Sequence, residues 1–289
     1  MINTLHLGLS YNCNMRCKHC FVNKQNNQLD FNVLKKYIDV LEENGLFFVI
    51  YTFGEPLLAD NFWTVSKYIS SKKIVQTIMT NGSLINSSVI SKLKDNDINN
   101  IYVSLDSVDS KKHDENRNYK GSYTKAISSL KLLVNNDFNV GMAVTINDDN
   151  VLEMNQFVEL AQEIGVKNIS FLRQRCGGKL IDLKNKLLYE KFYETYLCGE
   201  RKINILFHDP TLLKITKKLY DLGKISLNVY EKYMDMNSCH NSTTLSIEPS
   251  GNIKNCNLIN NSIGNISKDN VMAILKKGCG KNECVSNCS

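Results

Sequence analysis

The sequence predicts an α/β fold in which a parallel sheet curls into a partial (β/α)6 TIM-like barrel, followed by a small cysteine-rich extension. Short apolar, β-branched runs alternate with longer segments of helical period between residues 5 and 175. The runs are almost continuously apolar, which is typical of parallel strands covered on both faces. Right-handed crossovers would curl six such units into a barrel or a three-quarter barrel.

The predicted elements follow one another in a regular order. The segments expected to be strands are 5–11, 46–53, 74–82, 100–107, 138–147 and 167–175. The segments expected to be helices are 33–45, 62–71, 87–96, 123–136 and 151–165. Gly45 is expected to end the first of them. The polar, charged segment 108–122 is predicted to be a loop. Chemistry in such folds gathers at the carboxyl ends of the strands, so candidate functional residues should follow each strand.

The pattern weakens after residue 180, which defines the expected domains. Residues 1–180 should form the barrel core, and residues 181–236 a connecting helical segment with one candidate strand at 203–207. Residues 237–289 should form the cysteine-rich unit, which begins with a hairpin over 243–257 that turns at Pro249–Asn252.

Composition excludes several classes of protein. Lys and Arg number 35 against 29 Asp and Glu, a mild excess that indicates a solvated surface and no nucleic-acid partner. The N-terminal stretch lacks the basic start and the apolar run of a signal peptide, and no run of about 18 apolar residues predicts a membrane span. We therefore expect a cytoplasmic protein, in which clustered cysteines usually bind metal or react.

Three of the ten cysteines fall within the stretch CNMRCKHC, directly after the first predicted strand. The spacing Cys-x3-Cys-x2-Cys lets one loop place Cys13, Cys17 and Cys20 on three corners of a cubane iron–sulfur cluster. The fourth iron would then be open to a substrate, as in a catalytic zinc site. The alternative is half of a zinc site that His19 or a distant cysteine completes, and the spacing alone does not choose between them.

The stretch CNMRCKHC, in a loop after the first strand of a partial barrel, resembles the radical S-adenosylmethionine (SAM) superfamily. The resemblance implies a [4Fe–4S] cluster bound by Cys13, Cys17 and Cys20, whose open iron chelates the amino and carboxylate groups of SAM. Electron transfer would cleave the sulfonium and release a 5′-deoxyadenosyl radical that takes a hydrogen atom from the substrate. An external electron donor such as flavodoxin or ferredoxin is implied as well.

The turn TFGEPLL follows the second strand, where the family carries a Gly-Gly-Glu-Pro motif. Phe53 replaces the first glycine of that motif, and Gly54, Glu55 and Pro56 match the rest. The resemblance implies that this turn holds the methionine ammonium, for which a backbone edge and a carboxylate are suited. The alternative interpretation is a plain turn with a helix-starting acid.

The next two strand ends complete the SAM site that the resemblance implies. Asn81 belongs to a Thr-Asn-Gly turn that matches a family signature, although Asn-Gly turns are generic. Ser104 and Asp106 would lie near the ribose or the methionine end of SAM, or merely cap the strand. Arg117 matches an arginine that could grip the methionine carboxylate in bidentate fashion, or it is a solvated loop residue.

The cysteines near the C-terminal end resemble the SPASM and twitch extensions, which hold auxiliary iron–sulfur clusters. Cys239-x11-Gly251-x4-Cys256 matches the opening of these extensions, and Cys279-x4-Cys284-x3-Cys288 resembles a truncated ending. Five cysteines can supply one four-thiolate cluster, so one auxiliary [4Fe–4S] cluster is predicted. Cys239, Cys256 and Cys288 are the firmest ligands, with Cys284 or Cys279 as the fourth. A zinc site in this region is the alternative.

The remaining thiols and histidines receive lesser roles. Cys176, or the spare cysteine of the C-terminal group, is a candidate hydrogen-atom donor to a substrate radical, although an unreactive thiol is the blander interpretation. Cys198 is expected to pack within a helix. His113, His208 and His240 have no partner spacing and are expected to be structural or solvated.

Two substrate classes stay open. SPASM and twitch relatives often modify ribosomally made peptides by thioether formation, carbon–carbon cross-linking or epimerisation, and residues 113–133 look like that branch. Because the first cysteine is residue 13, a leader peptide would be held by the barrel, by residues 181–236 or by a separate leader-peptide-binding protein. The alternative substrate is a small alcohol or sugar, as in aminoglycoside pathways. A non-enzymatic zinc or electron-carrier module would predict a closed site and no SAM cleavage.

Overall fold

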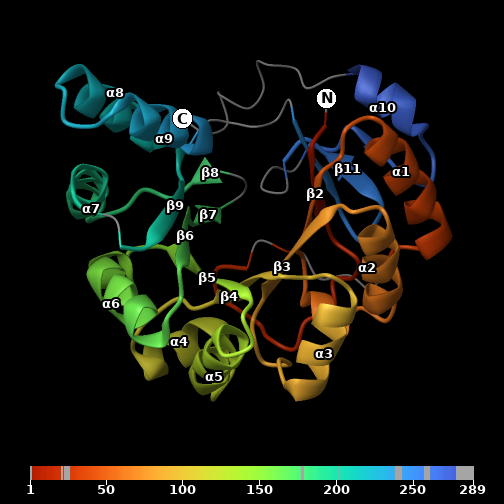
Figure 1. Ribbon diagram of the computed structural model, residues 1–289, viewed down its shortest axis with the longest axis horizontal. Helices are drawn as coiled ribbons and strands as arrows, with labels where there is room; N and C mark the ends of the chain where they lie inside the picture. Colours follow the sequence, from red (N-terminus) through yellow and green to blue (C-terminus); the bar gives the residue numbers. More distant parts are fainter. Residues whose placement is uncertain are drawn as a thin grey trace.

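One curved sheet carries the whole fold. The computed structural model describes residues 2–20, 22, 27–176, 179–200, 202–237, 243–256 and 261–277. Within them lies a ten-stranded sheet in the order β12-β11-β10-β1-β2-β3-β4-β5-β6-β9. The strands from β10 to β9 are parallel, and β11 and β12 are added to β10 in antiparallel fashion. The helices α1, α2, α3, α5 and α6 lie on the convex side of this sheet (Figure 1).

The predicted strands and helices of the barrel core are all present. The strands are β1 Thr4–Leu7, β2 Phe48–Tyr51, β3 Val75–Thr80, β4 Asn100–Ser104, β5 Asn139–Ile146 and β6 Asn168–Arg173. The α-helices that cover them are α1 Phe31–Glu43, α2 Phe62–Ser71, α3 Ser87–Asp95, α5 Ser122–Val134 and α6 Met154–Ile164. Short 3-10 helices are η1 Pro56–Leu58 and η2 Val151–Glu153. The predicted α/β fold class is therefore confirmed.

The segment 108–122, which was predicted to be a loop, contains the helix α4 Ser110–Arg117, so that prediction is wrong. Asp109 starts the helix by accepting a hydrogen bond from the backbone N–H of Lys112 at 2.8 Å. The residues that α4 buries are His113, Asn116 and Arg117. Because all three are polar, the segment lacks the apolar period by which an amphipathic helix is recognised.

Residues after 180 continue the same sheet. β9 Asn204–His208 pairs in parallel with β6, as the candidate strand at 203–207 suggested. The predicted hairpin is formed by β10 Thr244–Ile247 and β11 Asn252–Lys254, and β10 lies parallel to β1. The other elements are β7 Arg175–Cys176, β8 Lys179–Leu180, α7 Lys186–Cys198, η3 Pro210–Leu212, α8 Leu213–Asp221, α9 Leu227–Asn237, β12 Gly264–Asn265 and α10 Val271–Lys277.

The domain boundaries at residues 180 and 236 stay a prediction, although one sheet includes strands from all three expected segments. Among the described helices, none is both long and apolar enough to cross a membrane.

The two faces of the sheet differ in burial, which places the core. Residues that point toward the helices, such as Leu5, Ile78 and Ile101, are fully buried. Their neighbours on the concave face, such as His6 and Tyr102, keep partial exposure, and the alternation repeats along β1, β3 and β4. Along β1, β3 and β4 the concave face is therefore less buried than the face that the helices cover.

An asparagine ladder crosses the amino-terminal ends of four parallel strands. Asn139 donates to Asn100 at 2.7 Å, Asn168 to Asn139 at 2.9 Å, and Asn204 to Asn168 at 3.0 Å. Lys232 closes the row by donating to Asn204 at 2.8 Å. Because each side-chain amide both donates and accepts, the ladder fixes the relative register of β4, β5, β6 and β9.

Asn168→Ala should lower the free energy of unfolding by about 1–2 kcal/mol, because it removes two rungs of the ladder. Chemical denaturation followed by circular dichroism measures the change. Asn99→Ala is the matched control, since the Asn99 side chain is exposed and lies outside the ladder. Equal effects of the two substitutions would show that the ladder contributes no stability.

Candidate active site

The three cysteines at positions 13, 17 and 20 lie in a loop at the carboxyl end of β1. Cys13 and Cys17 are half-buried, and Cys20 is exposed. The Sγ atom of Cys13 accepts a hydrogen bond from the Met15 N–H at 3.4 Å, and the Cys20 N–H donates to the Cys17 carbonyl at 3.2 Å. These local bonds wrap the loop while leaving each thiol partly accessible.

The helix α4 forms one wall of this cysteine loop, defined as residues 13–20. The Arg16 N–H donates to the carbonyl of Arg117 at 3.3 Å, and the Lys18 N–H donates to the carbonyl of Asn116 at 2.8 Å. The last turn of α4 thus serves as a backbone acceptor edge for the loop. The segment that the sequence failed to identify as a helix is therefore part of the site.

The turn after β3 holds the opposite side of the cysteine loop. The side chain of Asn14 donates to Ser83 Oγ at 2.8 Å and accepts from Asn81 Nδ2 at 2.9 Å. Asn81 was predicted to be a site residue, whereas Asn14 was not. The signal for Asn14 was its place directly after the first cysteine of the motif.

The turn after β2 contacts the backbone just ahead of the loop. The Glu55 N–H donates to the carbonyl of Asn12 at 2.7 Å. A Cβ atom at Gly54 would lie 2.4 Å from that same oxygen and 2.7 Å from the carbonyl oxygen of Ser10. Gly54 also has a φ of 52°, so the position excludes a side chain on two independent grounds.

Phe53 has a φ of 62°, in the left-handed region that favours glycine. A glycine would adopt this backbone conformation without strain. A phenylalanine there costs about 1–2 kcal/mol. The buried ring offsets the strain, because it packs over Gly8, where a Cβ atom would lie 2.6 Å from Phe53 Cδ2. Tyr11 meets the ring edge to face at a centroid distance of 6.4 Å.

Glu55 is a buried carboxylate surrounded by neutral donors. It accepts from Thr80 Oγ1 at 2.7 Å and from the Asn81 N–H at 2.8 Å. Glu55 also caps the 3-10 helix η1, because its carboxylate accepts from the Leu57 N–H at 3.5 Å. It is therefore also the helix-starting acid of the alternative interpretation. Burial raises the pKa of Glu55, although these hydrogen bonds and the charge of Arg117 oppose the shift.

Asp106 and Arg117 form a buried ion pair after β4. Arg117 Nη2 lies 2.6 Å from Asp106 Oδ2, and the two residues are 7% and 0% exposed. Burial disfavours both charges, but Arg117 together with His19 and His113 lowers the pKa of Asp106, and Asp106 together with Cys17 raises that of Arg117. His113 accepts from the Asp106 N–H at 3.1 Å and so has the structural role expected of it.

The three nitrogen atoms of the Arg117 guanidinium have different surroundings. Besides Asp106, the guanidinium reaches Cys17, whose Sγ accepts from Nη1 at 3.6 Å. Nε is buried and has no hydrogen-bond partner among the described residues. The alternative of a solvated loop arginine is therefore excluded. Ser104 ends β4 on the concave face and is half-buried.

His19 lies beside the Asp106–Arg117 ion pair. Its Nε2 lies 3.6 Å from Asp106 Oδ2. Within the described ranges, no three His, Cys, Asp or Glu side chains are grouped closely enough to hold one metal ion.

The other cysteines lie away from this loop or outside the described residues. Cys176 is exposed in β7. Cys198 is exposed at the end of α7, so the expectation that it packs is wrong. Cys256 is half-buried just beyond β11. The remaining predicted ligands and one histidine fall outside the described residues: Cys239, Cys279, Cys284, Cys288 and His240.

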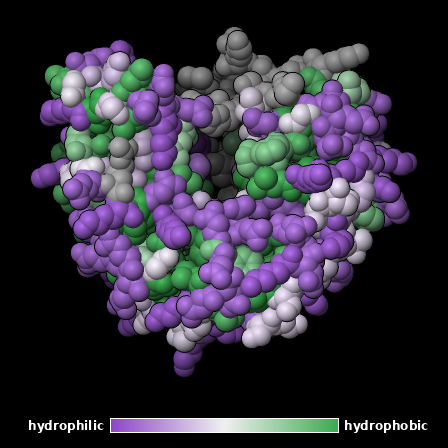
Figure 2. Space-filling view, in the orientation of Figure 1, coloured by the Kyte–Doolittle hydropathy of each residue, from purple (hydrophilic) through white to green (hydrophobic). Residues whose placement is uncertain are grey.

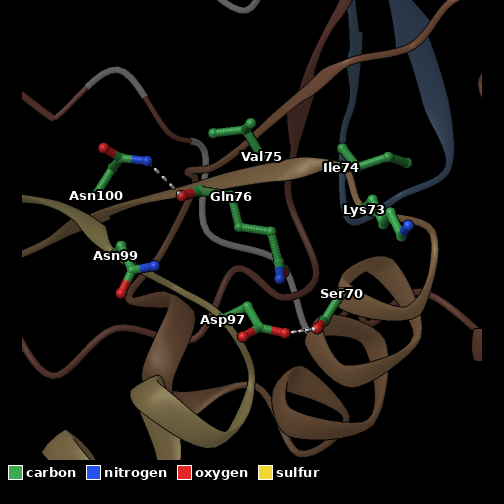
Figure 3. Close-up of a pocket in the computed structure, with 8 residues that line it drawn as sticks. All are labelled: Ser70, Lys73, Ile74, Val75, Gln76, Asp97, Asn99 and Asn100. Carbon is green, nitrogen blue, oxygen red and sulfur yellow. Dashed lines mark hydrogen bonds between the residues drawn. The ribbon is translucent and has the colours of Figure 1, made fainter.

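The space beside the site is the hollow that the curved sheet encloses. Figure 2 shows a hollow near the middle of the molecule in this view, with hydrophilic side chains along the lower border of the hollow. A separate pocket of about 280 Å³ lies at the amino-terminal ends of β3 and β4, lined by Ser70, Asp97 and Asn100 among others (Figure 3). Since conserved chemistry in such folds sits at the opposite ends of the strands, this pocket is not part of the site.

Comparison with known families identifies one matching model. The model described as Radical SAM superfamily matches residues 8–161, which include the cysteine loop, both following turns and α4.

Two relatives show how far the similarity extends. The antilisterial bacteriocin subtilosin biosynthesis protein AlbA of Bacillus subtilis is 27% identical over 278 residues, covering 92% of this chain and 58% of AlbA. The AdoMet-dependent heme synthase of Methanosarcina barkeri is 26% identical over 207 residues, covering 68% of this chain and 59% of the relative. The chain thus spans less than two thirds of either relative.

A solved structure supports the fold. Streptococcus suis SuiB bound to the precursor peptide SuiA superposes with a TM-score of 0.75 at 18% identity, covering 95% of this chain and 64% of that chain. At this identity the likeness concerns the fold alone.

Gly54→Ala should lower the free energy of unfolding by about 3 kcal/mol or more, because the new methyl group would meet two carbonyl oxygens. Gly121→Ala is the matched control: Gly121 also has a positive φ, of 81°, but nothing lies within 4 Å of its Cβ position. That control should lose about 1 kcal/mol. Urea denaturation measures both, and equal losses would contradict the close approach of the turn to the loop.

Glu55→Gln should change the pH dependence of stability in a defined direction. Because the pKa of Glu55 is raised above its ordinary value of 4.5, the folded chain binds this proton more tightly than the unfolded chain. The stability that the protonated form contributes is present below that ordinary value and is lost as pH rises through the raised pKa. The stability of the wild type minus that of the variant should therefore fall as pH rises above about 4 and through the raised pKa of Glu55. A difference that is constant or rises with pH would contradict this assignment.

Proposed function

The chain belongs to the radical SAM superfamily, and we propose that it binds a [4Fe–4S] cluster through Cys13, Cys17 and Cys20 and cleaves SAM reductively. One observation carries the proposal: the cysteine loop is hydrogen-bonded to both the turn after β3 and the helix after β4. When bound, the cluster and SAM would supply an electron and a 5′-deoxyadenosyl radical that abstracts a hydrogen atom from the substrate.

The charges of the site fit the methionine end of SAM, which carries one ammonium and one carboxylate. Glu55 offers a buried carboxylate that is contacted only by neutral hydrogen-bond donors among the described residues, so an ammonium would compensate its charge. Arg117 offers the buried, unpartnered Nε–H for the carboxylate. The charge of Arg117 also opposes the rise in the pKa of Glu55.

The remaining contacts with SAM follow from the strand ends. Ser104, half-buried on the concave face, is proposed to contact the ribose or methionine part, while Asp106 orients Arg117. The turns after β2 and β3 would contribute backbone rather than side chains. Their backbone would form the edge against which SAM lies, and the residues concerned are Phe53, Gly54, Pro56 and Asn81.

We propose that the substrate is a ribosomally made peptide, which the enzyme modifies by cross-linking, thioether formation or epimerisation. Support comes from the extent of the similarity: the match to the bacteriocin biosynthesis protein AlbA covers 92% of the chain, whereas that to the heme synthase covers 68%. The accessible concave face offers room for a peptide segment beside the cysteine loop.

Four further parts of the proposal concern the C-terminal cysteines, two partners and Cys176. Cys239, Cys256 and Cys288, with Cys284 or Cys279 as the fourth ligand, would hold an auxiliary [4Fe–4S] cluster. Flavodoxin or ferredoxin would deliver the electron, and a separate protein could present the leader peptide. Cys176, exposed near the end of β6, would be the candidate hydrogen-atom donor.

The proposal predicts the iron content of the anaerobically reconstituted chain. Wild type should hold about eight irons, and a Cys13/Cys17/Cys20→Ala variant about four, because one cubane per cysteine group is expected. Only the wild type should convert SAM to 5′-deoxyadenosine when dithionite supplies electrons, as chromatography of the products would measure.

Cys198→Ala is the control for loss of a thiol, because Cys198 is exposed on α7 and lies outside both proposed cysteine groups. It should retain both iron and SAM cleavage. Equal iron in the wild type and the triple variant would contradict cluster binding by the cysteine loop. About four irons in the wild type and almost none in the triple variant would contradict the auxiliary cluster alone.

A further inference from the structure

The side chain of Arg117 touches the cysteine loop at a sulfur atom, in addition to facing the proposed SAM site. Its Nη1 lies 3.6 Å from Cys17 Sγ, within the range of a hydrogen bond to sulfur. We propose that Arg117 is a positioning residue of the cluster itself, which donates a hydrogen bond to the Cys17 thiolate, stabilises the reduced cluster and slows the loss of iron. This inference rests on the proposed function.

The guanidinium is fixed in place before any ligand binds. Asp106 holds Nη2 at 2.6 Å, and Asp106 is itself fixed because its Oδ1 accepts from the Thr145 N–H at 3.2 Å. The Asp106 N–H in turn donates to the ring of His113 at 3.1 Å. A planar fork anchored at one nitrogen presents its other nitrogens in set directions, so the contact with Cys17 does not depend on a freely moving side chain.

The backbone of Arg117 is bound to the same loop as its side chain. Its carbonyl accepts from the Arg16 N–H at 3.3 Å, one residue before Cys17. The neighbouring Asn116 carbonyl accepts from the Lys18 N–H at 2.8 Å, one residue after Cys17. Cys17 is therefore enclosed by two backbone bonds and one side-chain bond from the end of α4. The side-chain donor to the Cys17 sulfur is thus a cation.

The charge of the donor defines the expected effect. Reduction adds one negative charge to a cluster and its thiolates, and hydrogen bonds to the sulfurs are among the features that set its reduction potential. A charge-assisted donor held in a buried position is stronger than a neutral one and is little screened by salt. Arg117 should therefore favour the reduced state and keep Cys17 in the thiolate form that binds iron.

The experiment compares the reduction potential and iron retention of reconstituted wild type, Arg117→Gln and Arg117→Lys, all without SAM. Spectroelectrochemical titration gives the midpoint potential of the cluster bound to the cysteine loop, and release of iron to a chelator gives its retention. In Arg117→Gln the midpoint should become more negative, and iron release should be about tenfold faster. The midpoint potential and iron release of Arg117→Lys should lie between those of the wild type and Arg117→Gln. Lysine keeps the positive charge but cannot donate to both Asp106 and Cys17 from one planar group.

Lys18→Gln is the matched control for charge. Lys18 lies in the same loop next to Cys17, but its side chain is exposed and contacts no sulfur in the described structure. It should leave both readouts unchanged. Should Arg117→Gln fail to fold, as circular dichroism would reveal, Arg117→Lys against Lys18→Gln gives the same comparison.

Three outcomes overturn the inference, and they are distinguishable from one another. Arg117 variants that match the wild type in midpoint and iron release would overturn it while leaving the proposed function intact. A wild-type chain whose iron content does not depend on Cys13, Cys17 and Cys20 would overturn the proposed function and the inference together. Equal shifts in Arg117→Gln and Lys18→Gln would also overturn it, because they would show a general effect of loop charge.

Discussion

The hydrogen bonds that tie the cysteine loop to its neighbouring strand ends are the constraint on which the site depends. A loop that contributes no strand of its own has little to hold it, and here Asn14 anchors it to the turn after β3 while the carbonyls of Asn116 and Arg117 anchor it to α4. The turn after β2 closes against its start through Gly54. Parallel strands make this convergence possible, because all their carboxyl ends meet at one rim.

The same rim concentrates features that a purely structural protein would avoid. It contains a buried carboxylate with neutral donors, a buried ion pair and a non-glycine residue at positive φ. Buried charges are unfavourable unless they are paired, and left-handed backbone is unfavourable for phenylalanine. Their presence together beside the cysteine loop is typical of a site built to receive a charged ligand.

The sequence predicted the barrel because its strands and most of its helices carry an apolar period, which burial on the helix side then confirms. It failed at α4, since the residues that this helix buries are polar, and at Cys198, whose helical position did not reveal which face it occupies. The family resemblance predicted Asn81, Asp106 and Arg117 as site residues. It could not predict that Arg117 reaches Cys17, because that contact joins residues a hundred positions apart.

The central claim is that the cysteine loop leaves one iron of its cluster free for SAM. The most direct test is the EPR spectrum of the reconstituted, dithionite-reduced chain before and after addition of SAM. We expect the component of the reduced [4Fe–4S] signal that the Cys13/Cys17/Cys20→Ala variant lacks to change shape when SAM binds the iron without a protein ligand. A signal from that variant that equals the wild-type signal, or a wild-type signal that is identical with and without SAM, would contradict the account.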